Sequence, residues 1–236
     1  MSNLDGLSNF KSHHVFLKYA HTHMHTYVRV LEKVASRYAP SRLLSFDAVH
    51  VFMALQLIHR RGHASRSTLE KELSLGAGAV KTIVKHMKMS GLVETSNGGT
   101  RMTVKGKGIW RELAESMPAE MPMPTSSVAL GRYNYAVLLR ELGFVIKSGI
   151  EQRDAAIRIG GTGATTLLCR DGGFFMHDSR SDPLKKEGGL RKELLEKLRP
   201  AEGDAVIIGG ADDSKSAELA AKSAALATIM VHEKHT

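Results

Sequence analysis

The sequence predicts an α+β protein whose two halves differ in structure and in charge. In the first half, apolar residues recur at the three- and four-residue spacing of amphipathic helices, and one hairpin signal stands at Asn97-Gly98. The second half, from about residue 128, alternates strand-like apolar runs with helical segments. Residues 117–127 hold three of the six prolines. Because proline disfavours helices and central strands, this Pro/Met-rich segment is predicted to be a semi-rigid linker between two domains.

The composition is that of a globular protein. Its 236 residues are 42% hydrophobic and 24% charged, which leaves room for two domains of about 100 residues each. No apolar run approaches the roughly 20 residues that span a bilayer, and the first residues lack the apolar core of a secretory signal. The single cysteine, Cys169, lies in an apolar run, so we expect a buried residue rather than a nucleophile. These features predict a cytoplasmic protein without membrane contact.

Residues 1–33 are expected to form a His-rich N-terminal extension. Helical spacing runs through residues 15–38 but is broken by the tract HTHMH. His21 and His25 would share a helix face at a spacing that can hold a metal, yet no cysteine or acidic residue completes a tetrahedral set, so no metal site is predicted. The alternatives are a solvated tail, or an upstream extension of the reading frame with Met24 as the start.

Two helices are expected after the extension. The first covers residues 46–61, with Ser45 as N-cap and an apolar face at three- and four-residue spacing. The second is short and begins at Ser67, where Glu70 three residues later completes the capping-box pairing. Residues 74–76 then form a connection of the length found between the helices of a helix-turn-helix.

The third helix is predicted over residues 77–90 and has two unlike faces. One face carries a buried apolar stripe, made of Val80, Ile83, Val84 and Met87. The opposite face presents Lys81, Thr82, Lys85 and Lys88. A recognition helix needs such an arrangement, because its apolar face docks on its neighbours while cations and a hydroxyl face the DNA groove. The alternative is an ordinary solvated helix face.

A hairpin and a closing helix complete the first half. Strands are expected at residues 92–95 and 101–104, joined by a turn at 96–100, and Thr103 is expected to cap the closing helix. Helix, short helix, recognition helix, hairpin and helix is the order of a winged helix-turn-helix, which we assign to residues 34–116. The phrase SGLVE at 90–94, followed by Thr103, Lys105 and Gly106, resembles bacterial and archaeal transcription regulators.

Charge is concentrated on the same half. Residues 1–116 carry 17 Lys and Arg against 8 Asp and Glu, a net charge of +9, whereas residues 117–236 carry 16 of each and no net charge. A basic half is what neutralisation of DNA phosphates requires. The predicted DNA-contacting residues are Arg66, Ser67, Lys81, Thr82, Lys85, Lys88, Asn97 and Arg101.

The second domain, residues 128–236, is predicted to be a ferredoxin-like α+β sandwich with one extra helix. The expected elements are strand 133–139, helix 151–159, a hairpin of 164–170 with 173–177, helix 190–198, strand 205–209 and helix 215–230. Strand 205–209 is wholly apolar, so we expect it to be central. The domain is expected to be independent and to sense a ligand or to form a homodimer. The Ala-rich helix 215–230 is a candidate contact surface, with core packing as its alternative.

Two Gly-rich loops are candidates for ligand binding. Residues 160–163 follow a helix and precede a strand, the reverse of a phosphate-binding context. Residues 209–215 have the correct context, but their two aspartates would repel a phosphate, so helix capping competes with ligand binding there. The candidate ligand-binding residues are Glu151, Arg153, Asp154, Thr162, Asp212 and Asp213. No catalytic constellation is identifiable, and the cofactor stays open.

Several segments resemble an archaeal family that joins an N-terminal winged helix to a C-terminal domain of unknown function. The resemblance covers about residues 34–230 and is carried, beside the winged helix, by RYAPSR (37–42) leading into Ser45-Phe46, KSGIEQRDAAI (147–157), GATTL (163–167) and GGADD (209–213). It implies a transcriptional regulator and brings no established ligand or catalytic residues.

The expected function is therefore that of a non-enzymatic regulator that binds double-stranded DNA and responds to a small-molecule effector. The alternative is a bifunctional enzyme of small-metabolite metabolism fused to a DNA-binding domain. A winged helix used for protein contacts is disfavoured by the basic face of the third helix.

Overall fold

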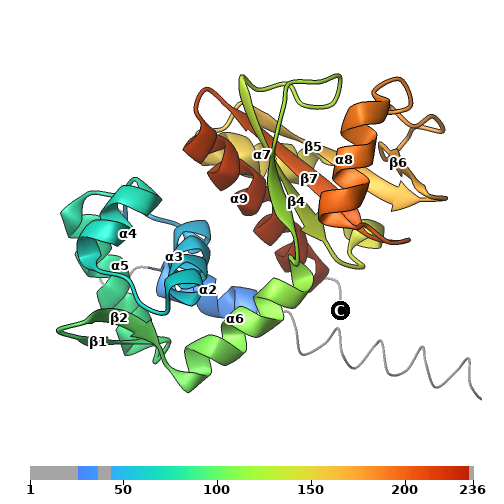
Figure 1. The fold of residues 1–236 in the computed structure, drawn as a ribbon. Helices are drawn as coiled ribbons and strands as arrows, with labels where there is room; N and C mark the ends of the chain where they lie inside the picture. The colour runs from blue at the N-terminus through green and yellow to red at the C-terminus, as the bar shows by residue number, and fades with distance from the viewer. Residues whose placement is uncertain (1–25, 37–43, 234–236) are drawn as a thin grey trace, which may run out of the picture.

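The computed structural model describes residues 26–36 and 44–233, which form an α+β fold with a helical part and an antiparallel sheet (Figure 1). The histidine tract and its possible metal pair lie outside the described residues. In the described ranges, no group of three or more His, Cys, Asp or Glu is placed to hold a metal ion. No helix there has both the length and the apolar character needed to cross a membrane.

The helical part contains five helices and one hairpin within the described residues. These elements are α2 (Thr26–Val34), α3 (Ala48–Arg61), α4 (Arg66–Leu73), α5 (Ala77–Met89), β1 (Val93–Ser96), β2 (Gly99–Met102) and α6 (Val104–Ser116). The helix α2 corrects the expectation of a separate N-terminal extension up to residue 33. Its residues Val28, Leu31 and Val34 are fully buried, so the end of that segment belongs to the core.

The helix starts differ from two of the three predicted caps. The N-cap of α3 is Asp47 rather than Ser45, and the Asp47 N–H donates to Nδ1 of His50 over 3.0 Å. Burial lowers the pKa of His50, with Asp47 acting in the opposite direction, and this favours the neutral ring that accepts the bond. α4 is capped by Ser65 rather than Ser67, because the Thr68 N–H donates to Ser65 Oγ over 3.1 Å. The cap of α6 at Thr103 is confirmed.

The hairpin β1–β2 is attached to the start of α4. Its strands pair from Val93↔Met102 to Ser96↔Gly99 around the Asn97-Gly98 turn, so the returning strand begins two residues earlier than expected. Ala64 and Thr100 exchange two backbone hydrogen bonds of 2.9 and 2.8 Å. Gly99 has a φ of +109°, and a Cβ there would lie 2.9 Å from the Ala64 carbonyl oxygen, so this contact requires glycine.

The second half is a five-stranded sheet covered by helices. Its elements are β3 (Glu120–Met123), β4 (Tyr133–Leu139), the 3-10 turn η1 (Gly143–Val145), α7 (Ile150–Arg158), β5 (Gly163–Arg170), β6 (Gly173–Phe175), α8 (Gly188–Leu198), β7 (Ala205–Ala211) and α9 (Ser214–Glu233). The strand order is β3-β4-β7-β5-β6, and every neighbouring pair is antiparallel. The predicted central position of the last apolar strand is confirmed.

The ferredoxin-like sandwich is wrong in layering and in strand order. α7 and α9 cover one face of the sheet and α8 covers the other, giving three layers instead of helices on one face (Figure 1). The physical reason is that the central strands are apolar on both faces. Val137 and Ile207 belong to the cluster under α9, whereas Leu138 and Val206 belong to the cluster under α8.

The predicted linker contains the edge strand β3. Met121 and Met123 are buried under α8, while Pro122 is exposed and pairs with Tyr135 of β4. Proline is compatible with a strand only at a sheet edge, where no neighbour needs its missing N–H. Two apolar residues at alternate positions were the signal for this strand, and the prolines concealed it.

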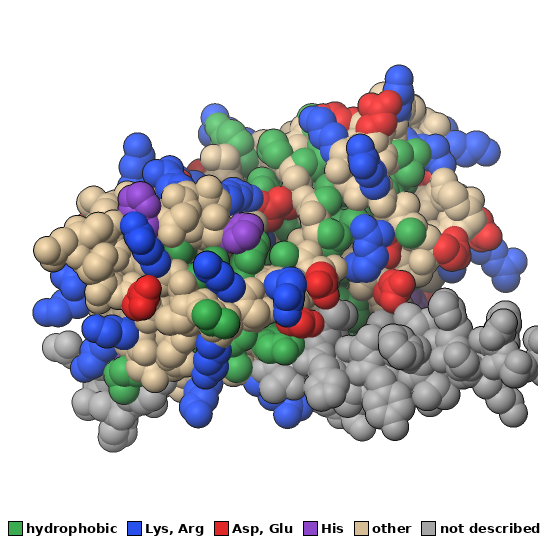
Figure 2. Space-filling model, turned by 60° about the horizontal axis from the view of Figure 1, so that its bottom comes forward, with side chains coloured by type: hydrophobic (Ala, Val, Ile, Leu, Met, Phe, Trp, Pro, Cys, Tyr) green, Lys and Arg blue, Asp and Glu red, His purple; other side chains and the backbone are tan. Residues whose placement is uncertain are grey.

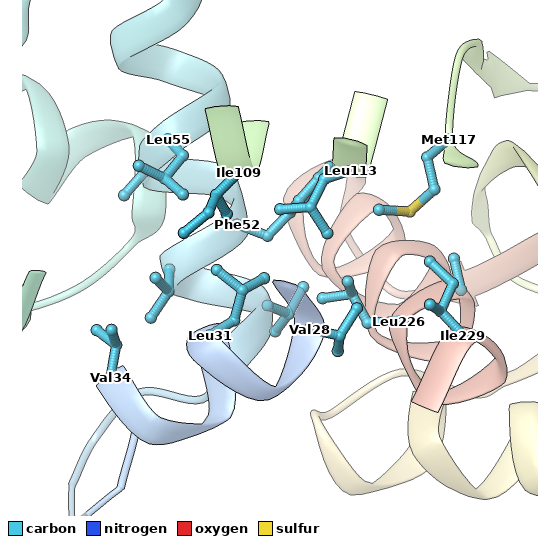
Figure 3. Packing of buried hydrophobic residues seen from close by; sticks show 14 of the residues in the cluster. Val28, Leu31, Val34, Phe52, Leu55, Ile109, Leu113, Met117, Leu226 and Ile229 are labelled. Carbon is cyan, nitrogen blue, oxygen red and sulfur yellow. The ribbon is translucent and has the colours of Figure 1, made fainter. Parts of the chain in front are cut away.

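The two halves share one hydrophobic core, in contrast to the expected independent second domain. Val28 and Leu31 of α2 lie between Phe52 of α3, Leu113 of α6, and the end of α9, where Leu226 contributes (Figure 3). All five side chains are at most 2% exposed. The alanines of α9 that were a candidate dimer surface are buried against the sheet and its neighbouring helices, so core packing is the correct alternative for that face.

A buried lysine lies at the same junction. Lys222 of α9 has 0% of its side chain exposed, and its Nζ donates to Gln56 Oε1 of α3 over 2.6 Å and lies 3.1 Å from Glu120 Oε2 of β3. Glu218, one turn earlier on α9, is its third polar partner. A buried cation is tolerated only when it is paired and hydrogen-bonded. Lys222 therefore fixes how the helical part sits on the sheet.

Removing core volume on α9 should destabilise the helical part as well. We expect Leu226→Ala to lower the free energy of unfolding by about 2–5 kcal/mol, because it opens a cavity in the shared core. Trp110, the only tryptophan, lies on α6, so its fluorescence reports unfolding of the helical part. The midpoint of urea unfolding followed by this fluorescence should shift together with the midpoint followed by circular dichroism. The matched control is Leu130→Ala, at a side chain 83% exposed. If the urea midpoint measured by Trp110 fluorescence were unchanged in Leu226→Ala, this would contradict the shared core.

The Lys222 pair predicts a specific pH dependence. Burial by itself would raise the pKa of Glu120, but Lys222 and hydrogen bonds from Gln56 and Lys222 together hold that pKa below its usual value. The contribution of Glu120 is thus present above its unfolded pKa and is lost as the pH falls through the folded pKa. Glu120→Gln should cost about 1–3 kcal/mol at neutral pH, and the cost should shrink below about pH 4. Urea unfolding of both proteins at pH values from neutral to below about 4 measures this cost. The control is Glu196→Gln on the exposed face of α8. A cost that is independent of pH would contradict the ionised pair.

Candidate nucleic-acid interface

The basic face of α5 is exposed over its length. Lys81, Lys85 and Lys88 are all exposed, while the opposite stripe, which includes Ile83 and Met87, is buried in the core. Thr82 is half-buried, and its hydroxyl donates to the Gly78 carbonyl over 2.9 Å. That hydroxyl therefore serves its own helix, whereas the three lysines are exposed to solvent.

A hollow separates the start of α4 from the hairpin. Its wall includes Arg66 and Asn97, two of the predicted residues, together with Arg61 and His63. Ser67 is exposed at the same helix start, where its hydroxyl is hydrogen-bonded to Ser65 Oγ over 2.9 Å. Sequence reasoning missed Arg61 and His63. The available signal was their position on either side of Gly62, the residue that ends α3.

The hairpin lies beside α5. Lys88 Nζ is 3.5 Å from Thr95 Oγ1 of β1, and Arg101 is exposed on β2. We use the name basic surface for the exposed cations of α4, α5 and the hairpin, with Arg61 at the end of α3: Arg61, Arg66, Lys81, Lys85, Lys88 and Arg101. The structure thus places the predicted cations on adjoining elements, although they are far apart in sequence.

The basic surface carries little compensating charge. Among the described residues, no carboxylate lies within ion-pair distance of Arg66, Lys81, Lys85 or Arg101, whereas Arg61 pairs with Glu72 at 3.1 Å. Figure 2 shows Lys and Arg over the helical part with few acidic side chains between them, and mixed charges over the sheet part. Exposed ammonium and guanidinium groups without acidic partners can neutralise phosphates.

The candidate ligand residues of the second half do not converge on one site. Asp213 caps α9: it accepts from the N–H groups of Lys215 and Ser216 and from Ser216 Oγ, and these bonds lower its pKa. Capping is thus its observed role. Thr162 and Asp212 are exposed near the end of β7, and the Thr162 N–H donates to the Gly210 carbonyl over 2.8 Å.

The other three candidates lie on α7. Glu151 is exposed, and Arg153 forms an exposed 3.4 Å pair with Asp154. Arg153 lines a hollow in the described sheet part, beside Thr166, which the sequence did not single out. Both residues lie in the segments 147–157 and 163–167 that carried the family resemblance.

Cys169 is buried as expected. The residue is 6% exposed on β5, and burial, with Asp204 nearby, raises the pKa of its thiol to about 12. The thiol is therefore protonated at neutral pH, which does not favour a nucleophilic role.

Comparisons with known proteins extend the fold description. A family model described as a domain of unknown function (DUF4443) matches residues 130–229, from just before β4 to near the end of α9. Among solved structures, the hypothetical protein PH0730 from Pyrococcus horikoshii OT3 is similar, with a TM-score of 0.60 and 22% identity over 81% of this chain and 96% of that chain. A search of curated proteins found no match. At this identity the structural similarity concerns the fold alone.

Proposed function

We propose that this chain is a transcription regulator that binds double-stranded DNA through a winged helix-turn-helix formed by α3 to α6. The observation that carries the proposal is the exposed row of Lys81, Lys85 and Lys88 on α5, flanked by cations of α4 and the hairpin. α5 is 13 residues long and follows α4 after a short turn, as a recognition helix does.

The arrangement supports a specific mode of docking. α5 would lie in the major groove, where its lysines approach phosphates and base edges, and the hairpin with Arg101 would reach the adjacent backbone. The hollow between α4 and the hairpin, with Arg61 and Arg66 in its wall, would receive a phosphate near the start of α4.

The sheet part would contribute sensing of an effector or formation of a homodimer. A symmetric dimer doubles the contact over a two-fold related operator. The interface would use a surface other than the alanine face of α9, because that face is buried within the protomer. Since the helical part shares a core with the sheet, movement of one part would act on the other.

The first test removes charge from α5. Lys81→Ala with Lys85→Ala should strongly weaken binding to duplex DNA and leave circular dichroism unchanged, because both side chains are exposed. Loss of two phosphate contacts should lower the slope of log affinity against log salt by about two. The control is Lys185→Ala with Lys186→Ala, which removes the same charge from an exposed segment of the sheet part. Equal effects of the two double variants would refute a role for α5.

The second test concerns the hairpin. Arg101→Ala should weaken binding to all DNA sequences about equally, because a phosphate contact carries no base information. The expected loss is about tenfold, the effect of one charge-assisted contact. Fluorescence anisotropy on a specific site and on its point variants measures this. A loss confined to one base-pair position would assign Arg101 to base contact instead.

A further inference from the structure

A second hollow lies in the sheet part, between the start of α7 and strand β5. Its volume is about 250 Å³, at the small end of ligand pockets. The wall combines Ser148, Gly149 and Arg153 at the start of α7 with Thr166 and Leu168 of β5. These residues come from two segments separated along the chain, and none belongs to the basic surface.

A buried hydroxyl without a partner lies in this wall. Thr166 is 8% exposed, and its Oγ1 has no hydrogen-bond partner. A buried polar group that is left unpaired destabilises the fold, so it needs an explanation. Oγ1 lies on the α7 side of β5, where a Cβ added at Gly149 would come within 3.5 Å of it. A ligand acceptor at the start of α7 would complete its hydrogen bonding.

The start of α7 supplies further donors. The helix has nine residues, and the first-turn N–H groups of Glu151 and Gln152 have no acceptor within the helix. Gly149 precedes the helix with a φ of +78°, and the absence of a side chain there keeps the space beside Thr166 open. Arg153 follows one turn later; its stem lies beside Gly163, and its exposed guanidinium has a weak 3.4 Å pair with Asp154. N–H groups, a hydroxyl and a guanidinium are the partners of a carboxylate or phosphate.

The rest of the wall is mainly apolar, with Thr165 and His177 as its other polar members. Ile146 is buried, while Ile150 is 52% and Met176 39% exposed at the rim. Exposed apolar side chains around a pocket can cover the hydrocarbon part of a ligand. The free N–H groups and Arg153 lie in the first turns of α7, with Thr166 facing them from β5, so the ligand would be oriented with its charge toward that helix.

The geometry points to a binding site for a small organic anion, with its anionic group at the start of α7 and a short apolar body against Ile146, Ile150 and Met176. Thr166 Oγ1 and the Arg153 guanidinium donate to the anionic group. The site supplies the effector pocket of the proposed regulator. The role of the site as an effector pocket rests on the proposed function. Anion binding itself does not, because it is measured without DNA.

The experiment uses the full chain labelled with ¹⁵N and three probes at concentrations up to about 20 mM. The probes are 4-methylpentanoate, its uncharged amide 4-methylpentanamide, and inorganic phosphate as an anion without an apolar body. We expect 4-methylpentanoate to shift the amide signals of Glu151, Gln152 and Thr166 saturably. The uncharged amide and phosphate should each bind at least about tenfold more weakly, because one lacks the charge and the other the apolar contacts. The amides at the exposed start of α8, Gly188 and Gly189, are the internal control.

Two variants with a matched control assign the contacts. Thr166→Val keeps the shape of the side chain and removes the hydroxyl. It should weaken 4-methylpentanoate binding about tenfold without lowering Tm, because the hydroxyl is unpaired in the free protein. Arg153→Gln should weaken binding by a similar factor of about ten. Arg158→Gln, an exposed arginine at the other end of the same helix, should leave the affinity unchanged.

Four results would overturn the site. These are no saturable shift with either anion, equal affinity for the carboxylate and its uncharged amide, equal shifts at the start of α8, or equal losses in Arg153→Gln and Arg158→Gln. Tighter binding of phosphate than of 4-methylpentanoate would refute the apolar part of the assignment. Failure of these tests with intact DNA binding would leave the proposed function standing. Anion binding without any DNA binding would refute the proposed function and retain the site.

Discussion

The packing of α9 against the helical part is the contact on which the rest of the structure depends. Lys222 shows this dependence most clearly, because its fully buried ammonium group is stable only while Gln56, Glu120 and Glu218 surround it. Around this polar cluster, α2, α3, α6 and α9 bury their apolar side chains in a common core. The orientation of α5 and the hairpin relative to the sheet is therefore fixed by this core, and the two halves are packed as one unit.

A series of packed helices connects the basic surface with the hollow between α7 and β5, where we propose an anion site. The hollow adjoins α7, α7 packs on α9, and Gln152 Nε2 donates to Thr228 Oγ1 across that contact over 2.8 Å. α9 in turn packs on α3, α3 contacts α4, and α4 packs on α5. A ligand changes DNA affinity only if it binds two states of this assembly with different affinity. Contact alone does not supply that difference, but the proposed coupling would run along these contacts, from α7 through α9 to the helical part.

The sequence predicted the helical part better than the sheet. Helical periodicity, Thr103 as a cap and Asn97-Gly98 as a turn are local signals, and each corresponds to an observed element. The prediction of the layers and of the strand order was wrong, because both depend on contacts between residues that are distant in sequence. β3 was hidden by prolines that only an edge strand tolerates. The sequence analysis did not single out Lys222, because its burial depends on contacts with α3 and β3. Thr166 had no signal of its own, since an unpaired hydroxyl is recognised only once its surroundings are known.

Hydrogen exchange of the full chain, measured by mass spectrometry with and without a pool of short DNA duplexes, tests the central claim most directly. The account predicts slower exchange in α5, at the start of α4 and in the hairpin β1–β2, with α8 of the sheet part unchanged as internal reference. Protection should decrease as salt rises, because phosphate contacts are weakened by counterions. Protection confined to the sheet part, or no protection at low salt, would contradict the assignment of the basic surface to DNA.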